Sequence, residues 1–380
     1  MNNMQLIKKG VMRSTLLLSL LMAATGASAL TCEFSPGSAL ITMQMPIQGS
    51  NITVGPDVPN GTVIHEQYYR PSGPISFHCS NNSGIYQPSS SYRFTHRPYP
   101  VSSSDGGVSA YAGKIMETNV PGIGVLFRRG TDASVPIVPF SQNSWGGTNA
   151  APAYTFTANN GYDFDMVLIK IGDIQPGVLD GASLPTLGSF FEASNITPIK
   201  AVETSFVGSL NIVSATCTTP DVTVNMGSYD IGQFKNAGDG TPWKDASIIM
   251  TNCPRFYGKL TDGRNSYYSD NGNSAIGAMT PNSISVSIQP NTPVTDSVKG
   301  IFNLQSGSGT ASGVGIQLAY GATGQVSPPL VNFAIAKNTL LGSADIRTRA
   351  VALVARYIKT SGPVTPGKAN ATATFTINYY

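Results

Sequence analysis

Charged residues are scarce in this sequence. Asp, Glu, Lys and Arg make up 11% of its 380 residues, and it has only three histidines and two tryptophans. Amphipathic helical patterns of normal length are absent, and nothing resembles a nucleophile elbow or a Walker loop. These absences exclude an ordinary helical protein and argue against the hydrolases and nucleotide-binding enzymes that carry those motifs.

Long hydrophobic runs are also missing. The longest, residues 15–24, falls short of the ~20 residues that a membrane-spanning helix needs. It follows the bases Lys8, Lys9 and Arg13 and precedes Ala27-Ser28-Ala29, which has the form of a signal-peptidase site. This pattern predicts a signal peptide over residues 1–29, rather than a membrane anchor, and makes Leu30 the first residue of the mature chain.

The apparent basic charge of the chain comes from this leader. Removing its three bases from the 23 in the full sequence leaves 20, which equals the number of acidic residues. A net charge of zero without a basic patch gives no reason to expect nucleic acid or an anionic membrane as a partner.

Cysteines are few but even in number. In an exported chain, Cys32, Cys79, Cys217 and Cys253 indicate disulfides. Four cysteines allow three pairings, and the economical choice joins the close pair within each half, Cys32–Cys79 and Cys217–Cys253. The alternative, a metal site, lacks a C-x-x-C motif, and the histidines show no ligand spacing. We expect no metal and no cofactor.

The sequence does contain many short alternating runs separated by turn residues, including 40 glycines and 26 prolines. This pattern predicts an all-β protein. One series of strands runs from Leu30 to about Lys200, and a second begins with 206–213. We therefore expect two tandem β-sandwich domains, residues 30–202 and 203–380.

The last ten residues form the best-patterned strand of the chain. Ala371, Ala373, Phe375, Ile377 and Tyr379 alternate with polar residues up to the C-terminal Tyr380. A strand that is patterned to its final residue is expected to be held by something.

The second domain resembles the pilin domain of chaperone–usher fimbriae. The motifs that carry the resemblance are Thr216-Cys217, Asp221-Val-Thr-Val-Asn-Met-Gly227, Ile249-Met-Thr-Asn-Cys-Pro254, Gly313-Val-Gly-Ile-Gln-Leu318, Ala350-Val-Ala-Leu-Val-Ala-Arg-Tyr357 and the penultimate Tyr379.

This resemblance implies an immunoglobulin-like sandwich that lacks its seventh strand. A periplasmic chaperone fills the groove first, and the N-terminal strand of the next subunit then replaces it at the outer-membrane usher. It further implies that Phe375, Ile377 and Tyr379 pack beside the groove, and that basic chaperone residues capture the carboxylate of Tyr380. The alternative is an ordinary last strand in a complete sandwich.

The first domain resembles the lectin-like receptor-binding domain of two-domain tip adhesins, such as the mannose-binding adhesins of type 1 fimbriae. The resemblance is carried by Leu30-Thr31-Cys32, Thr118-Asn-Val-Pro-Gly-Ile-Gly-Val125 and Val167-Leu-Ile-Lys-Ile-Gly-Asp-Ile-Gln-Pro-Gly177. A whole domain here stands where shaft pilins carry their donor strand. The resemblance therefore implies a subunit at the tip of a fimbrium on the bacterial surface.

The same resemblance gives candidate glycan ligands. They are the amine of Leu30, Asn81 and Asn82 after the second cysteine, and Tyr162 and Asp163 in the loop 159–163. Asn82 stands where the mannose-binding relative has an acid, so the sugar stays open, and a solvated turn is the alternative for both asparagines. Tyr86, Tyr92, Trp145 and Tyr162 are candidate sugar platforms, or else packing residues.

Asp163 and Asp165 could also be read as the paired carboxylates of a glycosidase. Neighbouring aspartates in such a context are more often solvated loop residues, and positioned acid–base groups are missing, so we do not expect an enzyme. The favoured hypothesis is a fimbrial tip adhesin for a surface glycan. The alternatives are a structural tip-capping subunit without sugar binding, or an adhesin for a protein receptor.

Overall fold

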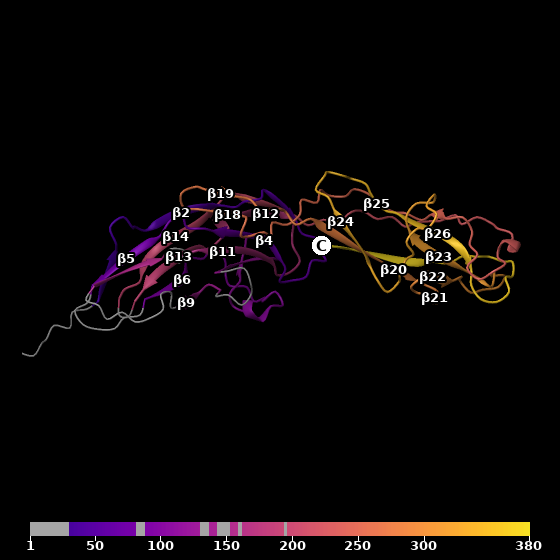
Figure 1. Ribbon diagram of the computed structural model, residues 1–380, viewed down its shortest axis with the longest axis horizontal. Helices are drawn as coiled ribbons and strands as arrows, with labels where there is room; N and C mark the ends of the chain where they lie inside the picture. The colour runs from indigo at the N-terminus through magenta and orange to yellow at the C-terminus, as the bar shows by residue number, and fades with distance from the viewer. Residues whose placement is uncertain (1–29, 81–87, 130–136, 143–152, 159–161, 194–195) are drawn as a thin grey trace, which may run out of the picture.

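The computed structural model describes residues 30–80, 88–129, 137–142, 153–158, 162–193 and 196–380. The chain forms an elongated molecule with one β-domain at each end (Figure 1). The N-terminal half, coloured indigo to magenta, occupies one end, and the yellow C-terminal strands occupy the other. The C-terminus itself lies in the middle, between the two domains. The expected signal peptide, residues 1–29, lies outside the described residues.

Two large sheets and two small sheets build the first domain. The six-stranded sheet has the order β19 (Ser274–Ala275), β18 (Tyr267–Tyr268), β4 (Val63–Tyr69), β11 (Phe164–Lys170), β8 (Ile123–Arg128), β7 (Met116–Glu117). The five-stranded sheet has the order β2 (Ile41–Pro46), β14 (Ile199–Val207), β13 (Thr186–Glu192), β6 (Ser89–His96), β9 (Phe140–Gln142). The small sheets are β1 (Thr31–Phe34), β5 (Ile75–Ser80), β10 (Ala153–Ala158) and β12 (Gly177–Asp180), β15 (Ser209–Val213), β3 (Asn51–Thr53).

Strand β11 is buried on both faces. Phe164, Met166 and Leu168 pack into the main core of the first domain, whereas Val167 and Ile169 pack into a second cluster on the opposite face. A strand buried on both faces reads as a continuous apolar run. This strand therefore forms a rigid base for the charged residues at its N-terminal end.

The first domain extends further along the chain than the sequence suggested. Strand β14 pairs with β13 and β2, and β15 pairs with β12 and β3. Phe206, Leu210 and Ile212 are at most 3% exposed in the first domain's core. The expected boundary after residue 202 falls inside β14, and the strand expected to open the second domain belongs to the first. An alternating run shows that a strand exists, but not which sheet it joins.

Three sheets build the second domain. Their orders are β16 (Lys244–Asp245), β26 (Leu353–Lys359), β23 (Val314–Tyr320), β22 (Ile301–Asn303), β21 (Val294–Asp296); β24 (Lys337–Leu341), β20 (Asn282–Pro290), β27 (Ala373–Tyr379); and β17 (Ile248–Met250), β25 (Arg349–Val351). Two apolar clusters fill this domain, and β20 contributes to both, with Ile288 in one and Ile284 and Val286 in the other. The all-β, two-domain prediction is confirmed.

Helical structure is limited to three single turns among the described residues, η1 (Ser109–Tyr111), η2 (Gly181–Ser183) and η3 (Ile231–Gln233). None of the described helical segments has the length or apolarity to cross a membrane. Each domain holds one disulfide, Cys32–Cys79 and Cys217–Cys253, as the sequence predicted.

A segment of the second domain reaches back onto the first. Residues 258–280, the cross-domain segment, carry β18 and β19, and β18 pairs in parallel with β4. Backbone N–H groups of Tyr68 and Arg70 donate to the carbonyls of Ser266 (2.8 Å) and Tyr268 (3.0 Å). Figure 1 shows β18 and β19 lying with the strands of the first domain. This segment covers an edge of the six-stranded sheet that would otherwise expose unpaired backbone groups.

Candidate functional site

An apolar groove opens in the second domain. It lies between the extended segment 221–227 and residues 369–375, and its volume is about 640 Å³. Its apolar lining is formed by Val222, Val224, Met226, Ala246, Ile248, Ile288, Phe302, Ile316, Leu318, Leu353, Ala355, Tyr357, Ala369, Ala371, Ala373 and Phe375. An open groove of this composition exposes apolar surface that ordinarily marks a binding site.

One wall of the groove is an unpaired segment. Residues 222–226 were expected to form a strand, but no ladder joins them to another strand of the described chain. Val224 and Met226 are half-buried against the groove's apolar cluster, whereas Thr223 and Asn225 are exposed. The side chains therefore alternate as in a strand, while the backbone lacks a partner.

The opposite wall is the edge of β27. This strand pairs with β20 alone among the described strands. The bonds Asn291 N–H to Thr372 O (2.9 Å) and Tyr380 N–H to Ser283 O (2.8 Å) show that even-numbered residues face β20. Bonded pairs recur every second residue in an antiparallel ladder, so odd-numbered residues direct their N–H and C=O groups toward the open edge.

The side chains of β27 follow the predicted alternation. Ala373, Phe375 and Ile377 are half-buried, Tyr379 is 5% exposed, and Thr374 and Thr376 are exposed. Phe375 lines the groove, and Ile377 and Tyr379 pack in the cluster beyond it. The Tyr379 ring stacks on Phe256, with ring centroids 6.2 Å apart.

The C-terminal residue is held by the chain itself. One carboxylate oxygen of Tyr380 accepts hydrogen bonds from Ser283 N (3.0 Å) and Asn282 Nδ2 (3.1 Å). Asn282 Nδ2 also donates to the Thr53 carbonyl of the first domain (2.8 Å), and the Tyr380 ring packs against that domain's core. The end of β27, which was expected to be held by some other part of the molecule, therefore lies at the junction of the two domains. Capture of its carboxylate by a chaperone remains a prediction.

In the first domain, Leu30 and Asp163, two of the described candidate glycan ligands, lie apart. Antiparallel registers place Thr31 opposite Ser80, and Ala153 also opposite Ser80, so Leu30 lies at the Ala153 end of β10. Asp163 comes five residues after Ala158, which is the other end of this six-residue strand. A six-residue strand spans roughly 17 Å, so the registers separate the two candidates. Leu30 is half-buried, whereas Asn81, Asn82, Tyr86 and Trp145 lie outside the described residues.

Tyr162 and Tyr92 are packing residues, which was the alternative to a sugar platform for both rings. Each ring is 1% exposed. Tyr162 meets Phe77 edge-on at 6.3 Å, and Tyr92 stacks on Phe140 at 4.8 Å. Burial of these aromatic rings in the core removes the faces that a sugar would need.

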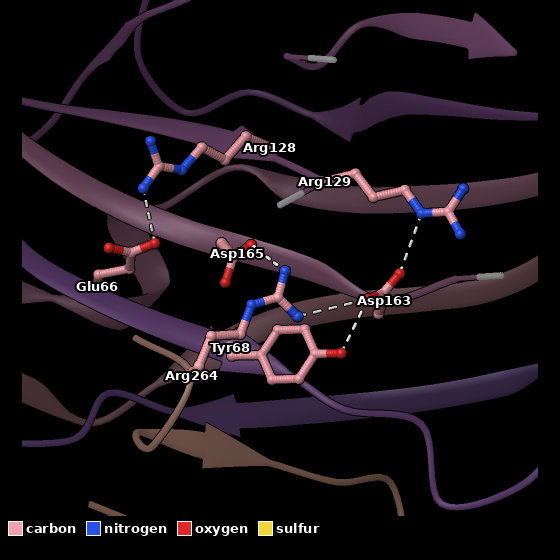
Figure 2. Close-up of polar contacts among 7 residues, drawn as sticks. All are labelled: Glu66, Tyr68, Arg128, Arg129, Asp163, Asp165 and Arg264. Carbon is pink, nitrogen blue, oxygen red and sulfur yellow. Dashed lines mark hydrogen bonds and ion pairs between the residues drawn. The ribbon is translucent and has the colours of Figure 1, made fainter. Parts of the chain in front are cut away.

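Asp163 belongs to an ion cluster and not to a ligand pocket. Its carboxylate accepts hydrogen bonds from Arg129 Nε (3.1 Å) and the Tyr68 hydroxyl (2.8 Å). Arg264 of the cross-domain segment lies 3.7 Å from Asp163 and 3.4 Å from the fully buried Asp165. Figure 2 shows Arg264 reaching between the two aspartates. The two carboxylates are thus bound to cations, an arrangement unlike the free acid and base of a glycosidase.

Tyr68 connects the two domains within this cluster. The guanidinium of Arg264 lies over its ring, 4.1 Å from the centroid. Burial, followed by the charge of Asp163, raises the pKa of Tyr68 to about 12, so the hydroxyl stays a donor at neutral pH. Beside it, Arg128 and Glu66 form a buried ion pair at 2.7 Å. These contacts are structural. Of the residues that make them, the sequence had pointed only to Asp163 and Asp165.

No group of three or more possible metal ligands gathers in the described part of the chain.

Comparisons with known proteins concern mainly the second domain, which contains the groove. The family model "Fimbrial protein" matches residues 205–380. The chain is 27% identical over 202 residues to a type 1 fimbrial subunit of Salmonella typhimurium, which covers 52% of this chain and 94% of that protein. It is 31% identical over 81 residues to the S-fimbrial adhesin of Escherichia coli, which covers 20% of this chain and 49% of that protein.

Solved structures similar to this chain include the CupB6 tip adhesin of Pseudomonas aeruginosa. It is 14% identical, covers 92% of this chain and 94% of that one, and has a TM-score of 0.33. The P pilus rod subunit PapA is 17% identical, covers 44% of this chain and all of that one, and has a TM-score of 0.30. The fimbrial family builds pili and does not catalyse reactions. Residues 205–380, the second domain, match the fimbrial protein family, and the chain is similar to a fimbrial subunit over about half of its length.

Proposed function

We propose that this protein is the adhesive subunit at the distal end of its pilus, and that its second domain accepts a strand from the next subunit. The apolar groove beside the open edge of β27 carries this proposal. An extended chain laid in the groove would bond to the free backbone groups of β27 while alternate side chains fill the apolar space. Before assembly, the periplasmic chaperone would supply that strand, and the usher would exchange it.

The pairing of β15 supports a distal position. Val213 is still hydrogen-bonded within the first domain, and Cys217 of the second domain follows after three residues. The segment in front of Cys217 is therefore part of the first domain's sheets and is not free to enter a neighbour. A subunit built this way accepts a strand through its second domain and presents its first domain outward.

The first domain would then bind a surface glycan. The proposed place for this contact is the end of the domain where β1 and β5 meet, at Leu30 and Ser80. Asn81 and Asn82 follow there, and planar amides can select among sugar epimers because an unpaired polar group penalises the wrong one. Tyr162 and Asp163 are no longer part of the proposed site.

A glycan-array screen tests this function. The full chain, purified as the complex with its chaperone, should bind one class of glycan reproducibly. Asn81→Ala or Asn82→Ala should abolish the binding, whereas Asn338→Ala on the exposed strand β24 should leave it unchanged. Absence of binding across a diverse array would contradict a lectin function and favour a tip cap or a protein receptor.

A further inference from the structure

The open edge of β27 is interrupted at its C-terminal end by the first domain. Tyr379 is one of the odd-numbered residues whose backbone groups point to the open edge. Its backbone N–H donates a hydrogen bond to Asp57 Oδ2 of the first domain at 2.8 Å. Asp57 lies in the loop between β3 and β4. A carboxylate is a stronger acceptor than a backbone carbonyl. An incoming strand would have to displace this carboxylate to bond Tyr379.

The carbonyl side of Tyr379 is blocked as well. Gly55 lies so close that a Cβ added there would stand 2.0 Å from the Tyr379 oxygen. The loop that brings Gly55 and Asp57 to this point is tied down within the first domain. Lys170 Nζ donates to the Pro56 carbonyl (2.5 Å), and the backbone N–H of Val58 donates to the Gly55 carbonyl (3.2 Å). Both backbone groups of Tyr379 therefore face the first domain and not solvent.

We propose that this loop, residues 55–57, is a register stop for the donated strand. The inference rests on the proposed strand-acceptor function and makes it more specific. The edge open to an incoming strand then covers Ala371, Ala373, Phe375 and Ile377, and pairing ends before Tyr379. The partner is an extended N-terminal segment of another fimbrial subunit, with apolar residues at alternate positions that lie over residues 371–377.

A stop of this kind has a physical use. A strand that slides by two residues keeps every side chain on the same face, so the apolar pattern alone does not distinguish the two registers. A fixed obstacle at one end does distinguish them. The first domain would thereby set how deeply the neighbouring subunit inserts, although it lies outside the groove.

Peptides of different length test the stop. The probes are a fluorescent seven-residue peptide of alternating Val and Thr, and two nine-residue versions extended by Val-Thr at one end or the other. The full chain from Leu30, its disulfides intact, is refolded with each peptide, and the peptide's dissociation rate is measured. With the native chain, extension toward Tyr379 should leave the rate unchanged.

In Asp57→Ala, the same extension should slow dissociation about fivefold, because the freed N–H of Tyr379 offers one further backbone hydrogen bond while Gly55 still covers its carbonyl. Asp57→Asn keeps a neutral acceptor and should lie between the two. Asp173→Ala, an exposed aspartate elsewhere in the first domain, is the matched control and should behave as the native chain.

The outcomes separate the two proposals. If no peptide binds the native chain, the strand-acceptor function fails, and the stop fails with it. If the peptides bind but extension slows dissociation equally in the native chain and in Asp57→Ala, the groove is an acceptor and the register stop is wrong.

Discussion

His65 is buried in β4, and only one of its two ring nitrogens has a hydrogen-bond partner among the described residues. Its Nε2 lies 2.9 Å from the carbonyl oxygen of Gln48, and Nδ1 has no hydrogen-bond partner among the described residues. Burial lowers the pKa of His65 from 6.5 to about 4, against the smaller opposing effect of the Gln48 hydrogen bond. The folded state therefore holds His65 neutral under conditions where the unfolded chain would protonate it.

This difference predicts a loss of stability in weak acid. Because the unfolded state binds more protons between pH 6.5 and about 4, the free energy of unfolding falls as the pH drops through that window. From pH 7 to pH 5, the loss due to His65 should be about 2 kcal/mol. Urea unfolding at the two pH values measures it, and His65→Gln, which keeps an N–H donor for Gln48, should remove most of the dependence. An equal loss in both proteins would refute the assignment.

Arg264 gives a second test at the residue scale. Its removal leaves Asp165, which is fully buried, without its cation from the cross-domain segment. Arg264→Met should lower the free energy of unfolding by about 1–3 kcal/mol, since Arg264 itself is partly exposed and screened. Lys299→Met, which breaks an exposed ion pair with Asp296, should leave stability unchanged. Equal effects of both substitutions in urea would show that the cluster adds nothing beyond a surface pair.

At the element scale, β27 has one face for the groove and one for solvent. Phe375 lines the groove, whereas Thr376 is exposed. Phe375→Asp should abolish recovery of a soluble complex with the periplasmic chaperone, because a charge would stand in the apolar space that the chaperone's strand is proposed to fill. Thr376→Asp adds the same charge on the solvent face and should leave recovery intact. Undiminished co-purification of Phe375→Asp would overturn the role of this face.

The sequence predicted β27 and the disulfides because the signals for both are local. Alternation over residues 371–379 fixes a strand and its two faces, and two close cysteine pairs limit the plausible pairings. The groove followed from resemblance, since a missing strand leaves no pattern of its own. Residues 206–213 were predicted as the first strand of the second domain, but they form the end of β14 and all of β15 in the first domain, because alternation does not identify the strand with which a segment pairs.

The ion cluster and the cross-domain segment could not be predicted in this way. Residues 258–280 contain many Gly, Asn, Ser and Asp residues and read as a loop. Their strand forms only because the edge of β4 offers hydrogen-bond partners, almost 200 residues earlier in the chain. Asp163 was assigned as a ligand because the loop 159–163 resembles a sugar-binding loop of the adhesin family. Its partner Arg264 lies in the other domain, and no sequence spacing links the two.

At the scale of the whole molecule, the two domains share structure. The cross-domain segment extends a sheet of the first domain, and the end of β27 is bonded to residues of that domain. The first domain is therefore not an independent module attached by a flexible linker.

Cutting the chain after Val213 tests this dependence. The fragment 30–213 retains β14 and β15 but exposes the edge of β4, so it should unfold at a lower temperature than the first domain does in the full chain, or aggregate. Residues 258–280, fused behind Val213 through a flexible linker, should restore much of the lost stability. If the fragment unfolds in calorimetry at the same temperature as the first domain in the full chain, residues 258–280 do not stabilise the first domain.

The central claim is that the second domain lacks a strand beside β27. Amide hydrogen exchange along this strand, followed by NMR before and after a donor peptide is added, tests it most directly. Before addition, the amides of Thr374 and Thr376, bonded to β20, should be protected, whereas those of Phe375 and Ile377 should exchange rapidly. After addition, all four should be protected. Strong protection of Phe375 and Ile377 in the chain alone would mean that the sandwich is already complete, and would contradict this account.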